Sequence, residues 1–341
     1  MLLHAKQLGM RKTVLINFAD NGKILDNVNA EMHPFLPIRK PVLMQYLSAA
    51  DIAKRWGVSE RSVRNYCAQG RVPGAFMTGK TWNIPADAQK PSRLNARSRV
   101  EDSALLARLL EEKNAGVRGG IYHKLQIELT YNSNHIEGSR LSVDQTRLIF
   151  ETSTIGAAED GLRVDDIIET ANHFRCIDYC LENALKPVSA PMLKELHRLL
   201  KSGTSDSGLS WFAVGDYKRL PNEVAGNATT APENVPAAMN DLLERYAPAS
   251  EHAIDEIIDF HVRFERIHPF QDGNGRVGRL VMLKECLANK VIPFVIADDM
   301  KALYYRGLSE WGRENGFLRD TCLAAQDTFR AWLDYFRIPC E

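Results

Sequence analysis

After residue 100, apolar residues recur at helical spacing in successive segments separated by glycine and proline. Little strand signal occurs there, so the pattern predicts a mainly α-helical domain over residues 101–341. Two of its helices are expected nearly in succession, one over residues 251–267 and one beginning near Gly275. The positions at helical spacing in the first are Ile254, Ile257, Ile258, His261 and Phe264. The loop between the two therefore opens directly into a helix N-terminus.

This loop and the following turn have the sequence His268-Pro-Phe-Gln-Asp-Gly-Asn-Gly-Arg-Val-Gly-Arg279. Pro269 ends the first helix, and Gly273 and Gly275 permit positive φ where the backbone must turn. A helix start of this kind aims backbone N–H groups outward, with the positive end of the helix dipole behind them. The pattern therefore predicts a phosphate-binding site.

Charged side chains in the same loop suit a nucleotide. Arg276 and Arg279 lie three residues apart on one helix face and can donate charge-assisted hydrogen bonds. Asp272 is a hard carboxylate suited to Mg²⁺, and His268 is a candidate general base. Each residue alone has a simpler interpretation, as a cap, a turn or a solvated surface. Those interpretations do not explain why all of them occur within 12 residues.

The loop meets every defined position of the signature H-x-F-x-[D/E]-G-N-G-R-x-x-R and so resembles the Fic family, over about residues 101–336. The resemblance implies an all-helical domain with a short β-hairpin flap, which transfers AMP from ATP to a Ser, Thr or Tyr hydroxyl of a protein. It implies that His268 is the base, that Asp272 holds Mg²⁺ and that Phe270 anchors the loop. The residues that it assigns to the ATP phosphates are Gly273, Asn274, Gly275, Arg276 and Arg279.

A second motif lies upstream, where Ser133-Asn-His-Ile-Glu137-Gly138 ends a helix expected over residues 121–138. It resembles the Fic inhibitory motif [S/T]-x-x-x-E-[G/N], which implies that Glu137 competes for Arg279. The alternative interpretation is an ordinary helix end with Glu137 in solvent.

Two further features fit the same resemblance. Residues 215–227 interrupt the helices and resemble the Fic flap, a hairpin that pairs with the target segment. Tyr304 and Tyr305 fall where the family encloses the adenine ring. Two tyrosines on an amphipathic helix are equally consistent with core packing.

The pattern of capping, glycine and apolar positions over residues 48–90 predicts a separate small domain. Ser48 can cap a helix that runs through Trp56, Gly57 breaks it, and Ser59 can cap a second helix to about Gln69. The spacing resembles a winged helix-turn-helix, with residues 76–84 as the wing. Residues 91–100 are polar and basic and indicate a linker.

Charge distinguishes this module from the rest of the chain. Ten basic and three acidic residues lie between residues 48 and 100, whereas 43 basic and 43 acidic residues cancel over the whole chain. A basic module of this kind suits the phosphate backbone of DNA. The candidate contacts are Arg61, Ser62, Arg64, Asn65 and Lys80. The alternative is a module used only for protein contact or as a spacer.

The expected wing contains a misleading match, because residues 74–81 satisfy the Walker A pattern G-x-x-x-x-G-K-[S/T]. That loop requires a buried strand before it and a helix after it. Pro85 stands where the helix should be running, and no apolar strand precedes Gly74. We therefore reject ATP binding at Lys80.

The remaining features are less specific. No apolar run reaches the length of a membrane span, no signal peptide is recognised, and the six cysteines form no metal or disulfide pattern. These features predict a reduced, cytoplasmic protein without membrane contact. A strand is expected at residues 14–18, and residues 1–47 are otherwise uninformative.

We interpret the chain as a helix-turn-helix module joined to a protein adenylyltransferase of the Fic type, self-inhibited by Glu137, with ATP as substrate and Mg²⁺ as cofactor. One alternative is a DNA-binding regulator whose Fic domain senses nucleotide or mediates assembly. Another is an enzyme that removes AMP from a target at the same site. The identity of the target protein stays open, with the chain itself as one candidate, and so do the DNA sequence and whether the protein is a homodimer.

Overall fold

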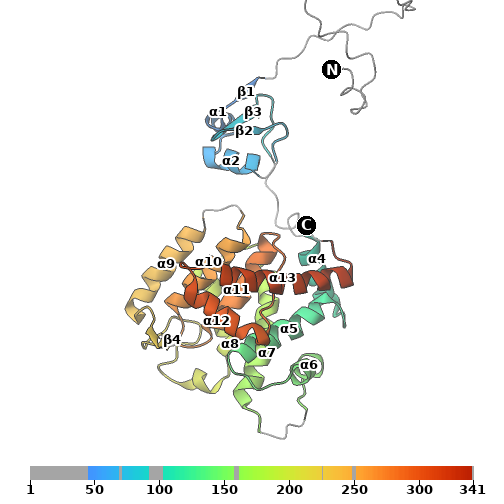
Figure 1. Cartoon of the computed structure of the whole chain (residues 1–341), viewed down its shortest axis with the longest axis vertical. Coiled ribbons are helices and arrows are strands. Elements are labelled where there is room, and N and C mark those ends of the chain that lie inside the picture. The colour runs from blue at the N-terminus through green and yellow to red at the C-terminus, as the bar shows by residue number, and fades with distance from the viewer. Residues whose placement is uncertain are drawn as a thin grey trace, which may run out of the picture. The chain divides into compact units, whose positions relative to one another are not determined.

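The computed structural model describes residues 45–68, 71–91, 103–156, 161–224, 226–247 and 251–339. The chain divides into two compact units, Met1–Gln89 and Lys90–Glu341 (Figure 1). The strand expected at residues 14–18 lies outside the described residues, as do Gln69 and linker residues 92–100.

The described residues of the smaller unit form two helices and a three-stranded antiparallel sheet in the order β1-β3-β2. Its elements are β1 (Tyr46–Leu47), α1 (Ala49–Trp56), α2 (Glu60–Ala68), β2 (Phe76–Thr78) and β3 (Thr81–Pro85). Ser48 caps α1 by accepting a hydrogen bond from a backbone N–H of its first turn, and Gly57 ends it in the left-handed conformation at φ 64°. Ile52, Val63 and Ile84 are fully buried. Both helices and the sheet therefore share one small core.

The Walker-like segment lies in the β2–β3 hairpin of this unit. Gly79 has φ 63°, and exposed Lys80 follows it in the turn. Thr81 begins strand β3, so no helix follows the loop. The backbone N–H cradle that a Walker A lysine needs is therefore absent from this hairpin.

Where it is described, the larger unit consists of helices and their connecting loops with one short hairpin, which confirms the mainly α-helical fold class (Figure 1). Its helices are α4 (Ala104–Ala115), α5 (Ile121–Ile136), α6 (Val143–Thr152), α7 (Val164–Glu182), α8 (Ala190–Lys201), α9 (Val235–Tyr246), α10 (Ile254–Ile267), α11 (Asn274–Ala288), α12 (Lys301–Glu310) and α13 (Gly316–Phe336). Its strands are β4 (Glu223–Val224) and β5 (Asn227–Ala228). Among the described residues, no helix is long and apolar enough to cross a membrane.

Helix α11 occupies the centre of this unit and contacts α5, α7, α8 and α10. The sequence pattern predicts a helix with one apolar face, yet 13 of its 15 residues are buried. Val277 and Leu280 pack in the main core, while Arg276 and Arg279 are buried with them. Buried charges require partners, and neighbouring helices supply them. The enclosure of α11 therefore creates the polar site described below.

Candidate active site

The loop between α10 and α11 is held from both sides. His268 ends α10 in the left-handed conformation with φ 52°, and the fully buried Phe270 ring stacks on His197 at 4.2 Å between ring centroids. The Asn274 side chain closes the loop, accepting a hydrogen bond from Phe270 N at 2.8 Å and donating one to Phe270 O at 2.9 Å. These contacts fix the loop without using its charged residues.

The two loop glycines serve different purposes. Gly273 has φ 81° and turns the chain into α11, as expected. Gly275 is helical and does not adopt the positive φ that a glycine permits. A Cβ at Gly275 would overlap the carboxylate of Glu137. The glycine therefore lets Glu137 lie against the first turn of α11, where the sequence predicts a phosphate.

His268 is oriented as a neutral imidazole. Its Nδ1 lies 3.3 Å from the carbonyl oxygen of Glu265, and a carbonyl only accepts, so Nδ1 carries the proton. Burial lowers the pKa of His268, and nearby Lys218 lowers it further. Nε2 then holds a free electron pair at neutral pH, which is the state that a general base needs.

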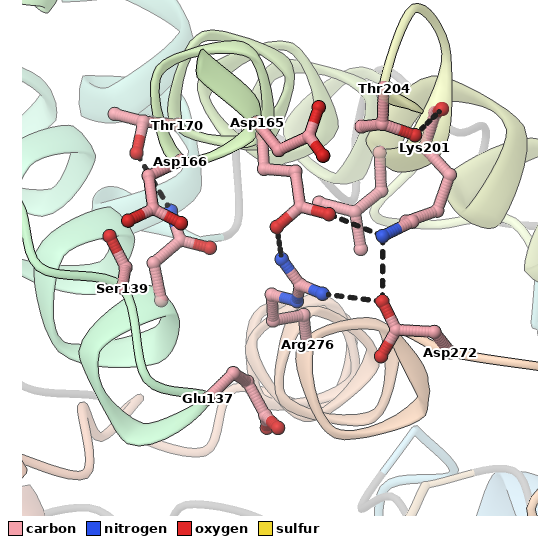
Figure 2. Close-up of polar contacts among 12 residues, drawn as sticks. Glu137, Ser139, Asp165, Asp166, Thr170, Lys201, Thr204, Asp272 and Arg276 are labelled. Atoms are coloured by element: carbon pink, nitrogen blue, oxygen red, sulfur yellow. Dashed lines mark hydrogen bonds and ion pairs between the residues drawn. The ribbon is translucent and has the colours of Figure 1, made fainter. Parts of the chain in front are cut away.

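Asp272 and Arg276 belong to a closed ring of four charged side chains (Figure 2). Asp272 Oδ2 accepts from Lys201 Nζ at 2.6 Å and from Arg276 Nη2 at 3.2 Å. The carboxylate of Glu169 pairs with the same two cations. Burial alone would raise the pKa of Asp272, but Arg276 and Lys201 outweigh it and hold that pKa well below its usual range. Asp272 is therefore ionised.

Arg279 is engaged by the end of α5. Its Nη2 donates to Glu137 Oε1 at 2.7 Å and to the carbonyl of Ser133 at 2.9 Å, and its Nε donates to Ser133 Oγ at 3.0 Å. Burial would lower the pKa of Arg279, but the Glu137 carboxylate outweighs it and raises that pKa. The structure thus joins the two motifs, 142 positions apart, in one contact.

The two tyrosines of α12, Tyr304 and Tyr305, differ in how far they are buried. Tyr304 is only 1% exposed and lies beneath Arg279, with its hydroxyl 2.6 Å from His261 Nε2. It therefore packs under the site and does not face a nucleotide. Tyr305 is 43% exposed, and its hydroxyl donates to the carbonyl of Ile136 at 3.4 Å. Only Tyr305 has the exposure that a wall of an adenine pocket requires.

Two further buried titratable side chains, His261 and Glu265, lie near Arg279. Burial lowers the pKa of His261 to about 3 and raises that of Glu265 to about 8, with Glu137 adding to the second shift. Both side chains are therefore neutral near pH 7 and do not form an ion pair. Arg279 consequently has Glu137 as its carboxylate partner among the described residues.

The segment expected to be the flap lies against the loop. Lys218 N donates to the carbonyl of Pro269 at 2.9 Å, and Asn222 Nδ2 donates to that of Phe270 at 3.1 Å. The hairpin itself, β4 and β5, occupies only the last part of the segment. Buried His197 links the two, because its ring accepts from Gly215 N at 2.9 Å while stacking on Phe270.

Four residues of this site carry no local sequence signal: Glu169, His197, Lys201 and Lys218. Each lies in an ordinary helix or loop, far along the chain from its partners. Lys201 is the last residue of α8 and is indistinguishable in sequence from a solvated helix end. Only the fold brings these side chains to the loop.

A polar cavity of about 210 Å³ adjoins the ring and the Glu137 turn. Asn134, Glu137, Glu169, Lys201, Asp272 and Arg276 are among its lining residues. A larger cavity of about 460 Å³ is lined by residues of α9, α10 and the turn before α13, and includes none of them. Size alone therefore does not identify the site, whereas the charges do.

Asp272 fits a divalent cation that arrives with a nucleotide. Its side chain is ionised and 48% exposed, so the carboxylate is open to a ligand. The described residues contain no group of three or more His, Cys, Asp or Glu side chains that could hold a metal ion alone. Mg²⁺ commonly completes its shell with phosphate oxygens and water, which suits a single carboxylate.

The candidate DNA contacts lie on the smaller unit. Arg61 and Arg64 of α2 and Lys80 of the hairpin are exposed, and Ser62 and Asn65 are half-buried. Arg64 also pairs with Glu60 one turn earlier. These side chains occupy the second helix and the hairpin turn, the two parts that a winged helix-turn-helix uses on DNA.

Comparison with known proteins finds sequences and structures similar to the part of the chain that contains the loop. Residues 187–286 match the family model Fic/DOC. A protein adenylyltransferase Fic of Nematostella vectensis is 26% identical over 208 residues, which cover 60% of this chain and 48% of the relative. A protein adenylyltransferase Fic of Drosophila willistoni is 27% identical over 183 residues, which cover 52% of this chain and 35% of the relative. The chain thus spans about half or less of the length of these relatives.

Solved structures agree in fold. A Fic domain containing signaling protein of Bacteroides thetaiotaomicron superposes with a TM-score of 0.51 at 25% identity, covering 67% of this chain and 90% of that one. A Fic family protein of Desulfovibrio desulfuricans superposes with a TM-score of 0.53 at 23% identity, covering 72% of this chain and 77% of that one. The larger unit therefore has the fold of these proteins.

Proposed function

We propose that this chain, in which residues 187–286 match the Fic/DOC family model, is a protein adenylyltransferase, which transfers AMP from ATP to a hydroxyl group of a protein. The observation that carries the proposal is the state of His268, a neutral imidazole with Nε2 unprotonated beside a helix N-terminus. Phosphate binding alone would not require a base there.

The proposed reaction assigns one task to each group. His268 Nε2 takes the proton of the target hydroxyl, and the hydroxyl oxygen forms a bond to the α-phosphorus of ATP. The bond from that phosphorus to the bridging oxygen breaks, and pyrophosphate leaves with the electron pair. The backbone N–H groups of Gly273, Asn274 and Gly275 and the side chain of Arg276 bind the phosphates, and Arg279 pairs with the γ-phosphate. Positioning and charge neutralisation supply most of the catalysis in such transfers.

Asp272 would hold Mg²⁺ together with the phosphates. When bound, the metal neutralises phosphate charge and favours departure of pyrophosphate. Asp272 suits this task because the ring keeps its carboxylate ionised while leaving the side chain half exposed.

Glu137 is proposed to inhibit the enzyme. Its carboxylate pairs with Arg279 and lies against Gly275. It therefore occupies the place of the γ-phosphate on Arg279 and the space beside the first turn of α11 that the other phosphates would use. A carboxylate on a buried guanidinium is hard to displace. ATP would then bind with its α-phosphate displaced from the line of attack.

The target is proposed to bind along the hairpin. β4 and β5 pair over two residues each and leave backbone groups for an added strand. Tyr305 would contact the adenine from α12.

The test of the function uses ATP labelled at either the α- or the γ-phosphate. The chain is incubated with cell lysate and Mg²⁺, and labelled protein is separated by electrophoresis. Transfer of AMP predicts label from α-labelled ATP and none from γ-labelled ATP. Label from the γ-position would indicate a kinase reaction, and label from neither position, also with Glu137→Gly, would contradict the proposal.

We also propose that the smaller unit binds DNA, because exposed Arg61, Arg64 and Lys80 lie on the second helix and hairpin turn of a strongly basic segment. Lys80→Ala is expected to weaken DNA binding and to reduce its salt dependence by about one released ion, while ATP affinity stays unchanged. Arg276→Ala is expected to do the reverse. Fluorescence anisotropy with a labelled duplex at several salt concentrations, and calorimetry with ATP, measure both. Loss of ATP binding in Lys80→Ala would restore the Walker interpretation.

A further inference from the structure

The ring of Asp272, Arg276, Glu169 and Lys201 draws its members from four elements. Glu169 comes from α7, Lys201 ends α8, Asp272 lies in the loop and Arg276 lies in the first turn of α11. Negative and positive groups alternate, and each carboxylate pairs with both cations. Figure 2 shows Lys201 and Arg276 both directed at Asp272. The ring is therefore neutral as a whole.

Exposure within the ring is uneven. The side chains of Lys201, Arg276 and Glu169 are 3%, 5% and 14% exposed, whereas that of Asp272 is 48% exposed. A cation reaching the ring from solvent therefore meets Asp272 first, while the other three charges act on it from behind. The His173 imidazole nearby stays neutral, because burial and Arg276 lower its pKa to about 3. It adds no charge to the ring.

The backbone at Lys201 is held in place by contacts that do not involve the charges of the ring. Asn172 Nδ2 donates to the carbonyls of Leu200 at 3.0 Å and Ser202 at 2.8 Å, the residues on either side of Lys201. Thr204 Oγ1 donates to the carbonyl of Lys201 itself at 2.9 Å. Asn172 lies one helical turn after Glu169 on α7. The same stretch of α7 thus fixes the end of α8 and supplies the carboxylate that Lys201 needs.

We propose that Glu169 and Lys201 are positioning residues that set the affinity of Asp272 for a divalent cation, with Lys201 opposing the metal and Glu169 favouring it. The proposal rests on the proposed function, in which Asp272 holds the metal of Mg-ATP. Lys201 shares Asp272 Oδ2 and so repels a second cation there. Glu169 pairs with Lys201 and Arg276 and so offsets part of their positive charge. The Asp272 carboxylate is then less fully neutralised by these two cations and can bind a metal ion.

Opposite effects on metal affinity follow. Lys201→Met removes one positive charge and is expected to tighten metal binding by about tenfold. Glu169→Gln removes one negative charge and leaves two cations to share Asp272, so binding is expected to weaken by about tenfold. This size corresponds to one unit charge about 6 Å from a divalent ion at the dielectric constant of water, ~80. The double variant balances the charges and should return to within about threefold of wild type.

The experiment titrates the full chain with Mn²⁺ in the presence of ADP and measures free Mn²⁺ by electron paramagnetic resonance. Lys201→Arg keeps the charge and should keep the affinity of the wild type. Glu195→Gln removes a carboxylate that pairs with Arg198 on the exposed face of the same helix, and should change nothing. Melting curves identify any variant that does not fold.

The outcomes separate this proposal from the proposed function. If the wild type transfers AMP but Lys201→Met and Glu169→Gln shift Mn²⁺ affinity in the same direction, or not at all, the assigned roles are wrong. If the affinities move in opposite directions while no AMP is transferred, the roles stand and the proposed reaction is wrong. Absence of Mn²⁺ binding by the wild type would contradict both. Should the single variants not fold, the folded double variant still tests the balance of charge.

Discussion

Replacement of His268 by alanine is expected to reduce AMP transfer by about 10²–10⁴-fold, the usual contribution of a general base. Binding of Mg-ATP should stay close to wild type, because the phosphate site is built from other groups. The measurement is the rate of label transfer from α-labelled ATP in a Glu137→Gly background, together with ATP affinity by calorimetry. Near wild-type transfer by the variant would exclude His268 as the base.

A matched control and a pH profile accompany this variant. His123→Ala removes a half-buried histidine of α5 that pairs with Glu151 outside the site, and should leave transfer unchanged. Burial lowers the pKa of His268, so its neutral form persists below the ordinary histidine pKa of about 6.5. The acid limb of the transfer rate should therefore be centred below pH ~6.5. An acid limb centred above that value would contradict the described environment.

Replacement of Glu137 by glycine is expected to raise AMP transfer by about 10²-fold or more, with a smaller change in ATP affinity. The variant frees Arg279 for the γ-phosphate and clears the space beside Gly275. Glycine suits this position because Glu137 lies just after the last helical residue of α5, with a backbone outside the helical conformation. Labelled AMP incorporated by wild type and variant is the measurement.

Three single variants and one double variant serve as controls for this prediction. Glu137→Gln removes the charge but keeps the volume, and should activate less than glycine. Glu182→Gly removes a carboxylate that pairs with Lys113 at the end of α7, and should leave transfer at the wild-type level. Arg279→Ala breaks the same pair but removes the phosphate ligand, so it should not activate. Equal labelling by wild type and Glu137→Gly would contradict the inhibitory role of Glu137. Labelling by the double variant Glu137→Gly/His268→Ala would contradict the role of His268 as the general base.

Local pattern was sufficient for the elements around the loop. Periodicity predicts a helix over residues 251–267, and Pro269 and Gly273 predict the turn into the next one; α10 ends at Ile267 and α11 begins at Asn274. Short-range rules hold here because helix ends depend on residues within one turn of them. The same rules did not predict that α11 is buried on every side. Enclosure depends on which helices surround it, and no local pattern contains that information.

Tertiary structure decided which side chains work together. The sequence determined by itself that a candidate base, a hard carboxylate, two arginines and a helix start suited to phosphate lie within 12 residues. It did not indicate that Lys201 and Glu169 complete a ring with Asp272 and Arg276, because those ion pairs join positions 71 and 107 apart. Nor did it separate Tyr304 from Tyr305, which differ only in the direction they face on α12. Covalent neighbours determine local conformation, whereas the burial and pairing of a charge depend on segments that only folding brings together.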